Sequence, residues 1–123
     1  MTTKFRAVGD SVPYTNASGS TITKDSVVEM SHTIGVAVTD IANGATGTVA
    51  IEGVFEVPKV PAAVFVVGEK LIWDTSAGQF DDSAATAAEG DITGAAIAMK
   101  AGANAETTCL VKLTPGNATL TPA

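Results

Sequence analysis

Few side chains in this sequence could carry out catalysis or bind a metal ion. His32 is the single histidine, and no cysteine or second histidine lies near it to complete a zinc site. Ser31 and Asp40 flank His32, but a serine beside a histidine is common, and a catalytic triad requires a specific geometry. We therefore interpret His32 as a surface or edge-strand residue. The single cysteine, Cys109, lies in an apolar stretch, which favours a small buried thiol over a reactive thiolate.

The acidic and glycine-containing segments also lack the spacing that ligand binding needs. Asp74, Asp81 and Asp82 could suggest a calcium loop, but the alternating oxygen ligands and the distal glutamate are missing. We interpret these aspartates as parts of solvated turns. No glycine is followed by lysine or arginine, so a phosphate-binding P-loop is absent. The sequons at Asn16 and Asn117 are interpreted as turn sequences. We expect no catalytic residue, no metal site and no cofactor.

The charge distribution argues against two kinds of partner. Seven lysines and arginines against 13 aspartates and glutamates give a net charge of −6, and the seven cations are scattered along the chain. A nucleic-acid-binding protein needs a clustered basic surface, so we expect no nucleic-acid partner. The longest uncharged run is polar and far shorter than the roughly 20 apolar residues of a membrane helix. No apolar signal segment follows the first residues, which favours synthesis in a cytoplasm.

The composition and periodicity predict strands. Alanine, threonine, valine and glycine make up 64 of the 123 residues, and such small or β-branched side chains suit thin sheets. We predict a mainly β fold, a small barrel or sandwich of short strands with at most one short helix. Residues 61–65 are the candidate helical turn, and 83–89 are expected to form an irregular loop. The predicted strands are 34–39, 47–57, 64–67, 71–74, 92–99 and 107–114.

An internal repeat organises the chain. At an offset of 59 residues the following pairs align: Gly9 with Gly68, Gly19 with Gly78, Gly35 with Gly94, and Tyr14 with Trp73. Because glycines are kept where turns need them, matching glycines indicate matching turns. We predict one β domain, 1–123, of two pseudo-repeated halves, about 5–60 and 64–114, that share one core. The alternative is chance similarity in a chain rich in glycine and alanine.

Two stretches, 34–59 and 67–74, resemble the small phage capsid cement, or head-decoration, proteins, a family long catalogued as a phage domain of unknown function. The residues that carry the resemblance are Phe5, Gly9-Asp10, Gly53-Val54-Phe55, Val57, Lys59, Gly68-Glu69, Leu71, Trp73-Asp74 and Val111-Lys112-Leu113. The match covers nearly the whole chain. One departure is that the family's second I-G-x-A element reads Ile92-Thr-Gly-Ala95 here, which shifts a strand start by one residue.

The resemblance implies a structural protein without catalysis or cofactor. Its partners would be the major capsid protein, whose lattice it would bind on the outer surface, and other copies of itself, with a trimer favoured. The protein would be made in the host bacterial cytoplasm and reside in the virion. The alternative is a small β-barrel adaptor that recognises a peptide or carbohydrate, which aromatic side chains exposed in a groove would favour. We instead expect Tyr14 and Trp73 to anchor the core, with the Trp73 indole N–H hydrogen-bonded.

The first six residues combine threonines with the densest cationic spot of the chain. We predict that 1–6 form an arm that contacts the capsid or a neighbouring copy, because an aromatic ring between two cations can fill an apolar groove beside acidic groups. The alternative is an edge strand that begins the barrel. The candidate contact residues are Thr2, Thr3, Lys4, Phe5 and Arg6.

Overall fold

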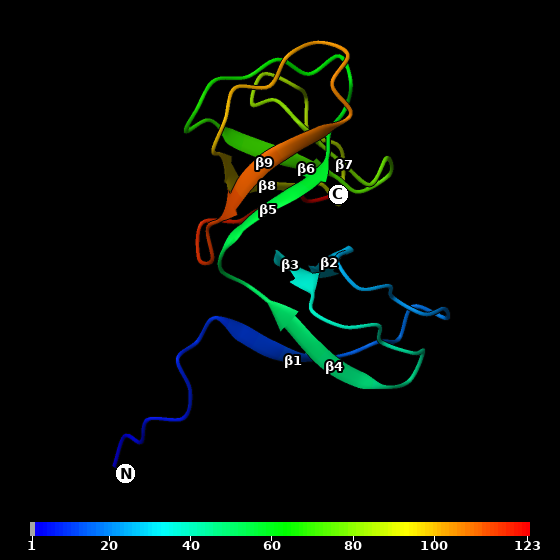
Figure 1. Ribbon diagram of the computed structural model, residues 1–123, viewed down its shortest axis with the longest axis vertical. Coiled ribbons are helices and arrows are strands. Elements are labelled where there is room, and N and C mark those ends of the chain that lie inside the picture. The colour runs from blue at the N-terminus through cyan, green and yellow to red at the C-terminus, as the bar shows by residue number, and fades with distance from the viewer. Residues whose placement is uncertain (1) are drawn as a thin grey trace.

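The computed structural model describes residues 2–123, which form ten strands and no helix (Figure 1). These residues accordingly include no helix of the length and apolarity needed to cross a membrane. The predicted mainly β fold is confirmed. The strands are β1 (Ser11–Thr15), β2 (Val27–Met30), β3 (Thr33–Ala37), β4 (Thr46–Ala50), β5 (Val54–Pro58), β6 (Lys70–Asp74), β7 (Gln79–Asp81), β8 (Ile92–Ala98), β9 (Thr108–Leu113) and β10 (Thr119–Leu120).

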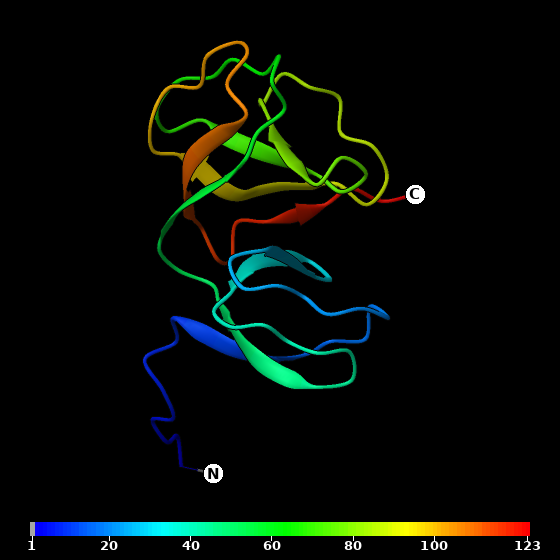
Figure 2. The ribbon, with the colours of Figure 1, turned by 45° about the vertical axis from the view of Figure 1, so that its right-hand side comes forward.

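The strands form two antiparallel sheets that follow one another along the long axis (Figures 1 and 2). The first sheet has the order β1-β4-β3-β2. The second has the order β5-β9-β8-β6-β7, with β10 beside β8. The second sheet curls until the residue after β5 meets β7, where Lys59 and Phe80 form a parallel bridge. This curled sheet with a smaller sheet against it agrees with the predicted small barrel or sandwich.

Alternating side chains place the core inside the curl. In β9, Cys109, Val111 and Leu113 are buried, whereas the residues between them face solvent, as expected for a strand with one covered face. β8 is buried along most of its length and is rich in alanine and glycine, so neighbouring elements can approach it on both faces. The larger hydrophobic cluster joins these residues to Ile34 and Val36 of β3. A smaller cluster joins Val28, Ala37 and Val49 of the first sheet to Ile41 of the loop between β3 and β4.

Two of the predicted strands differ from the structure. The segment 47–57 is not one strand, because the chain leaves the first sheet between β4 and β5. Gly53 adopts a φ of +126°, a backbone conformation that residues with a side chain rarely take. Residues 64–67 are also not a strand: Phe65 forms a single bridge with Gly102, and the surrounding backbone is irregular. Within the stretch Phe65 is buried, whereas Val64, Val66 and Val67 are exposed.

The two halves of the predicted repeat agree in position and differ in pairing. Gly9 and Gly68 have φ values of +91° and +87°, and each precedes a strand, β1 or β6, by two residues. β3 and β8 also begin 59 residues apart. However, β1 pairs with β4, whereas β6 pairs with β8, the counterpart of β3. The change of sheet at Gly53 also precedes the expected boundary near residue 60. The duplication therefore stays a prediction.

Candidate functional site

The structure does not assemble the residues around His32 into a catalytic group. His32 is exposed in the two-residue turn between β2 and β3, which is closed by the pairing of Met30 with Thr33. The Asp40 carboxylate accepts a hydrogen bond of 2.7 Å from the Lys24 backbone N–H. Asp40 therefore stabilises a loop instead of orienting the imidazole.

Cys109 lies on the inner face of β9 and is 8% exposed. Burial raises the pKa of its thiol to about 11, although the nearby Lys59 charge partly opposes that shift. The thiol is therefore protonated at neutral pH, which makes it a poor nucleophile. Cys109 acts as a small apolar side chain in the larger hydrophobic cluster.

The acidic side chains of the second sheet hold turns together. The Asp74 carboxylate accepts hydrogen bonds from the Ser76 hydroxyl and the Ala77 N–H, which lower its pKa. Asp82 accepts one from the Ala84 N–H. Asp91 is buried and links the turn after β6 to the loop before β8. Within residues 2–123, no group of three acidic, histidine or cysteine side chains is placed to hold a metal ion.

The Glu69 carboxylate forms hydrogen bonds whose contribution to stability depends on pH. Its carboxylate accepts hydrogen bonds from the Ser83 N–H (2.9 Å) and hydroxyl (2.8 Å), and these bonds lower its pKa below the ordinary value of 4.5. A lowered pKa stabilises the folded state above the unfolded-state pKa, and this contribution is lost as the pH falls through the folded-state value. We expect Glu69→Gln to reduce the melting temperature by a few degrees at pH 7 and by progressively less as the pH falls below the ordinary pKa of 4.5. Melting curves over a pH series measure this, with the exposed Glu52→Gln as control; an effect that does not change with pH would contradict it.

The structure reveals a buried lysine that the sequence did not suggest as an internal residue. Lys59 follows β5 and is fully buried. Its ammonium donates hydrogen bonds to the carbonyls of Val60 (2.9 Å), Pro61 (3.0 Å) and Glu106 (3.3 Å). The ammonium also lies 6.0 Å from the centre of the Phe65 ring. Lys59 therefore ties the loop after β5 to the loop before β9.

Trp73 is a core residue, as predicted. It is 5% exposed, and its indole Nε1–H donates a hydrogen bond of 2.7 Å to the Glu29 carboxylate on β2. Its ring packs edge-on against Phe80 with centroids 5.0 Å apart. Tyr14 is half-buried against the smaller cluster. Neither aromatic supplies the exposed binding groove that would favour an adaptor; among residues 2–123, Phe5 is the aromatic residue that is exposed.

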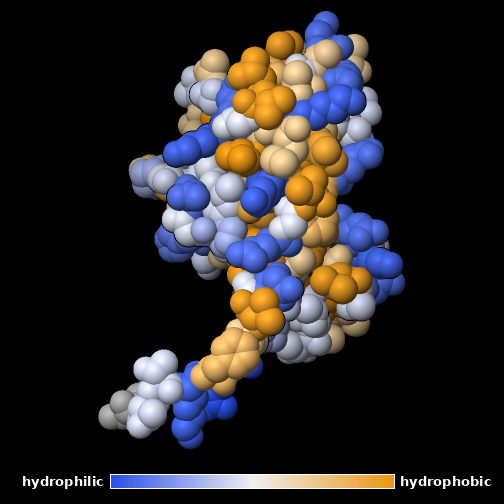
Figure 3. Space-filling view, turned by 60° about the vertical axis from the view of Figure 1, so that its left-hand side comes forward, coloured by the Kyte–Doolittle hydropathy of each residue, from blue (hydrophilic) through white to orange (hydrophobic). Residues whose placement is uncertain are grey.

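The N-terminal segment stands apart from both sheets. Residues 2–6 are all exposed and belong to no strand, and Phe5 and Val8 are each 84% exposed. Figures 1 and 3 show the segment running away from the body of the molecule. Met1 lies outside the described residues. The segment has the form of an arm, and what it contacts stays a prediction.

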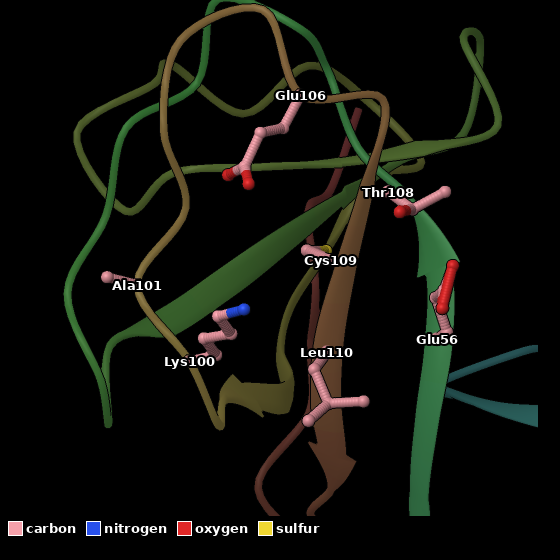
Figure 4. A pocket seen from close by; sticks show the side chains of 7 residues that line it. All are labelled: Glu56, Lys100, Ala101, Glu106, Thr108, Cys109 and Leu110. Carbon is pink, nitrogen blue, oxygen red and sulfur yellow. The ribbon is translucent and has the colours of Figure 1, made fainter.

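A cleft of about 220 Å³ opens on the outer side of β5 and β9 (Figure 4). Leu110, which is exposed on the outer face of β9, forms its apolar floor, and Ala101 and Cys109 complete the apolar part of the lining. Glu56 of β5 and Glu106 of the loop between β8 and β9 stand at its sides, and Lys100 enters from the same loop. The cleft thus combines an apolar surface with two carboxylates and one ammonium group.

Comparison with known protein families shows to which family the chain belongs. The family model described as phage cement protein matches residues 7–113, which include β1 to β9 and leave the arm and β10 outside. A comparison with individual curated proteins finds no match. The resemblance inferred from the sequence is therefore confirmed: this chain belongs to the phage cement protein family, a family of structural components of phage capsids.

Proposed function

We propose that this protein is a head-decoration protein that binds the outer surface of the major capsid protein lattice and stabilises the head. It acts without catalysis, as a homo-oligomer, with a trimer favoured, and resides in the virion. The family match supports a role in the capsid. The observation that carries the contact role is the arm, 2–6, which is exposed and lies outside both sheets.

The arm has the composition of a contact segment. Phe5 exposes 84% of its surface, and burying an aromatic ring at an interface releases water from a large apolar area. Lys4 and Arg6 flank it in a chain whose net charge is −6. An arm of this kind binds an apolar groove with acidic groups at its sides, and the ionic part of that binding weakens with salt.

Deleting residues 2–6 tests whether they are a contact arm or a part of the fold. We expect the deletion to leave the melting temperature nearly unchanged, because these residues pack against neither hydrophobic cluster. We expect binding to heads that lack the protein to fall at least tenfold, as measured by co-sedimentation over a salt series.

The control is His32→Gln, in the exposed turn between β2 and β3 and outside both the arm and the cleft, which should bind heads as the unmodified chain does. If the deletion unfolds the protein, the arm is part of the fold. If the deleted protein binds heads with full affinity, the arm is not a contact, and failure of the intact protein to bind heads would overturn the proposed function.

A further inference from the structure

The arm and the cleft beside β5 and β9 carry complementary features. The arm offers an exposed aromatic ring between two cations, and the cleft offers an apolar floor between two carboxylates. We infer that the cleft binds the N-terminal arm of a second copy of this chain. The inference rests on the proposed role of the arm as a contact segment and names its receptor.

The size and lining of the cleft suit Phe5. A volume of about 220 Å³ exceeds the roughly 150 Å³ of a cavity that accommodates benzene, so a phenyl ring can enter. Leu110 is 38% exposed on the floor, and Met99, whose N–H bonds the Leu110 carbonyl, is 39% exposed next to it. Leu110 and Met99 therefore give the ring of Phe5 an apolar surface to cover at this place.

The charges fit an extended arm. In an extended chain Phe5 points to one side, and Lys4 and Arg6 point to the other, about 7 Å apart. With Phe5 in the cleft, the long stems of both cations can fold over its sides toward Glu56 and Glu106, which Figure 4 shows on either side of Cys109. Lys100 offsets one of the two carboxylates, so the cleft keeps a net charge of −1, opposite to that of the arm.

The geometry favours a second copy over the chain's own arm. The root of the arm is fixed to the first sheet, where the Asp10 carbonyl accepts a hydrogen bond of 2.9 Å from the Ile51 N–H. From there the arm runs away from the second sheet, on which the cleft lies (Figures 1 and 2). A copy that gives one arm and receives another makes a head-to-tail contact, and such contacts form a closed ring when the rotation between copies closes.

The test measures self-association in the absence of heads, by sedimentation of the full chain up to about 100 µM, well above the micromolar range of small interfaces. We expect the full chain to form a discrete oligomer. Deletion of 2–6 and the substitution Leu110→Asp should each weaken that association at least tenfold. Val64→Asp, at an exposed valine outside the cleft, is the matched control and should leave it unchanged.

Two further experiments test which residues face each other in the contact and whether the arm of one copy binds the cleft of another. Arg6→Glu should weaken the association, Arg6→Glu with Glu56→Lys should restore it, and Arg6→Glu with Glu89→Lys, which lies outside the cleft, should not. In a mixture, the arm-deleted chain and the Leu110→Asp chain should form a one-to-one dimer, because one retains an intact cleft and the other an intact arm.

Several results would overturn the inference. A full chain that stays monomeric, association that survives arm deletion, or a mixture that stays monomeric would each show that the arm does not bind a second copy's cleft. If the cleft variants lose only head binding, the cleft receives a capsid segment instead, and the inference is wrong although the proposed function stands. If the chain self-associates as expected but does not bind heads, the proposed function alone fails.

Discussion

Replacing Lys59 by methionine is expected to reduce the free energy of unfolding by about 2 to 4 kcal/mol. Methionine fills a similar volume but donates no hydrogen bond, so the carbonyls of Val60, Pro61 and Glu106 lose the donor that they share. An acceptor left unsatisfied in a buried site costs about 1 to 3 kcal/mol. Methionine carries no charge, so the variant avoids the cost of burying an ammonium group, and this gain offsets part of the loss. Urea unfolding midpoints, with the slope checked for constancy, measure the change.

Lys112→Met is the matched control, because Lys112 is exposed on the outer face of β9 and its replacement should change stability by less than about 0.5 kcal/mol. Hydrogen exchange adds a local readout. In the Lys59 variant, exchange should accelerate first at Phe65 and Gly102, whose backbones bond each other across the two loops that the lysine joins. Equal stability of the Lys59 and Lys112 variants would mean that the buried ammonium contributes nothing to the fold.

The fold class could be predicted because the strands of the second sheet have clear patterns. β9 alternates buried and exposed residues, and β8 is a run of small apolar residues, so both appear in the sequence with nearly correct bounds. β1 was missed as a strand because it contains Pro13, which a strand tolerates only at the edge of a sheet; β1 is indeed an edge strand. β2 and β7 are too short to show a period, and their position depends on the strands beside them.

Most of the internal contacts could not be predicted from the sequence. The burial of Trp73 follows from its size in a chain that has few large side chains, but its partner Glu29 lies 44 residues away and depends on how the sheets meet. Lys59 has a side chain that is almost always found at the surface, so nothing local indicates that three carbonyls surround it. The cleft is formed by β5, β9 and the loop before β9, and no single segment of sequence describes it.

Replacing Trp73 by alanine is expected to cost about 3 to 5 kcal/mol of unfolding free energy. The indole lies in the larger cluster against Phe80, so its removal leaves a cavity that the surrounding strands cannot fill. The same substitution breaks the bond between the second sheet and Glu29 of the first. Tyr14→Ala, at the equivalent position of the predicted repeat, should cost less than half as much, because Tyr14 is only half-buried. Thermal and urea unfolding of both variants compare these costs.

A double-mutant cycle separates the hydrogen bond from the packing. Trp73→Phe keeps an aromatic ring but removes the N–H donor, and Glu29→Ala removes the acceptor. If the bond joins the two sheets, each single substitution should lower stability, and the double variant should lose about 1 kcal/mol less than their sum, because the second change finds the bond already gone. Strict additivity would show that the bond contributes nothing and that packing against Phe80 carries the whole effect. A Trp73→Ala variant with an unchanged unfolding free energy would instead show that the tryptophan does not stabilise the core, despite its 5% exposure.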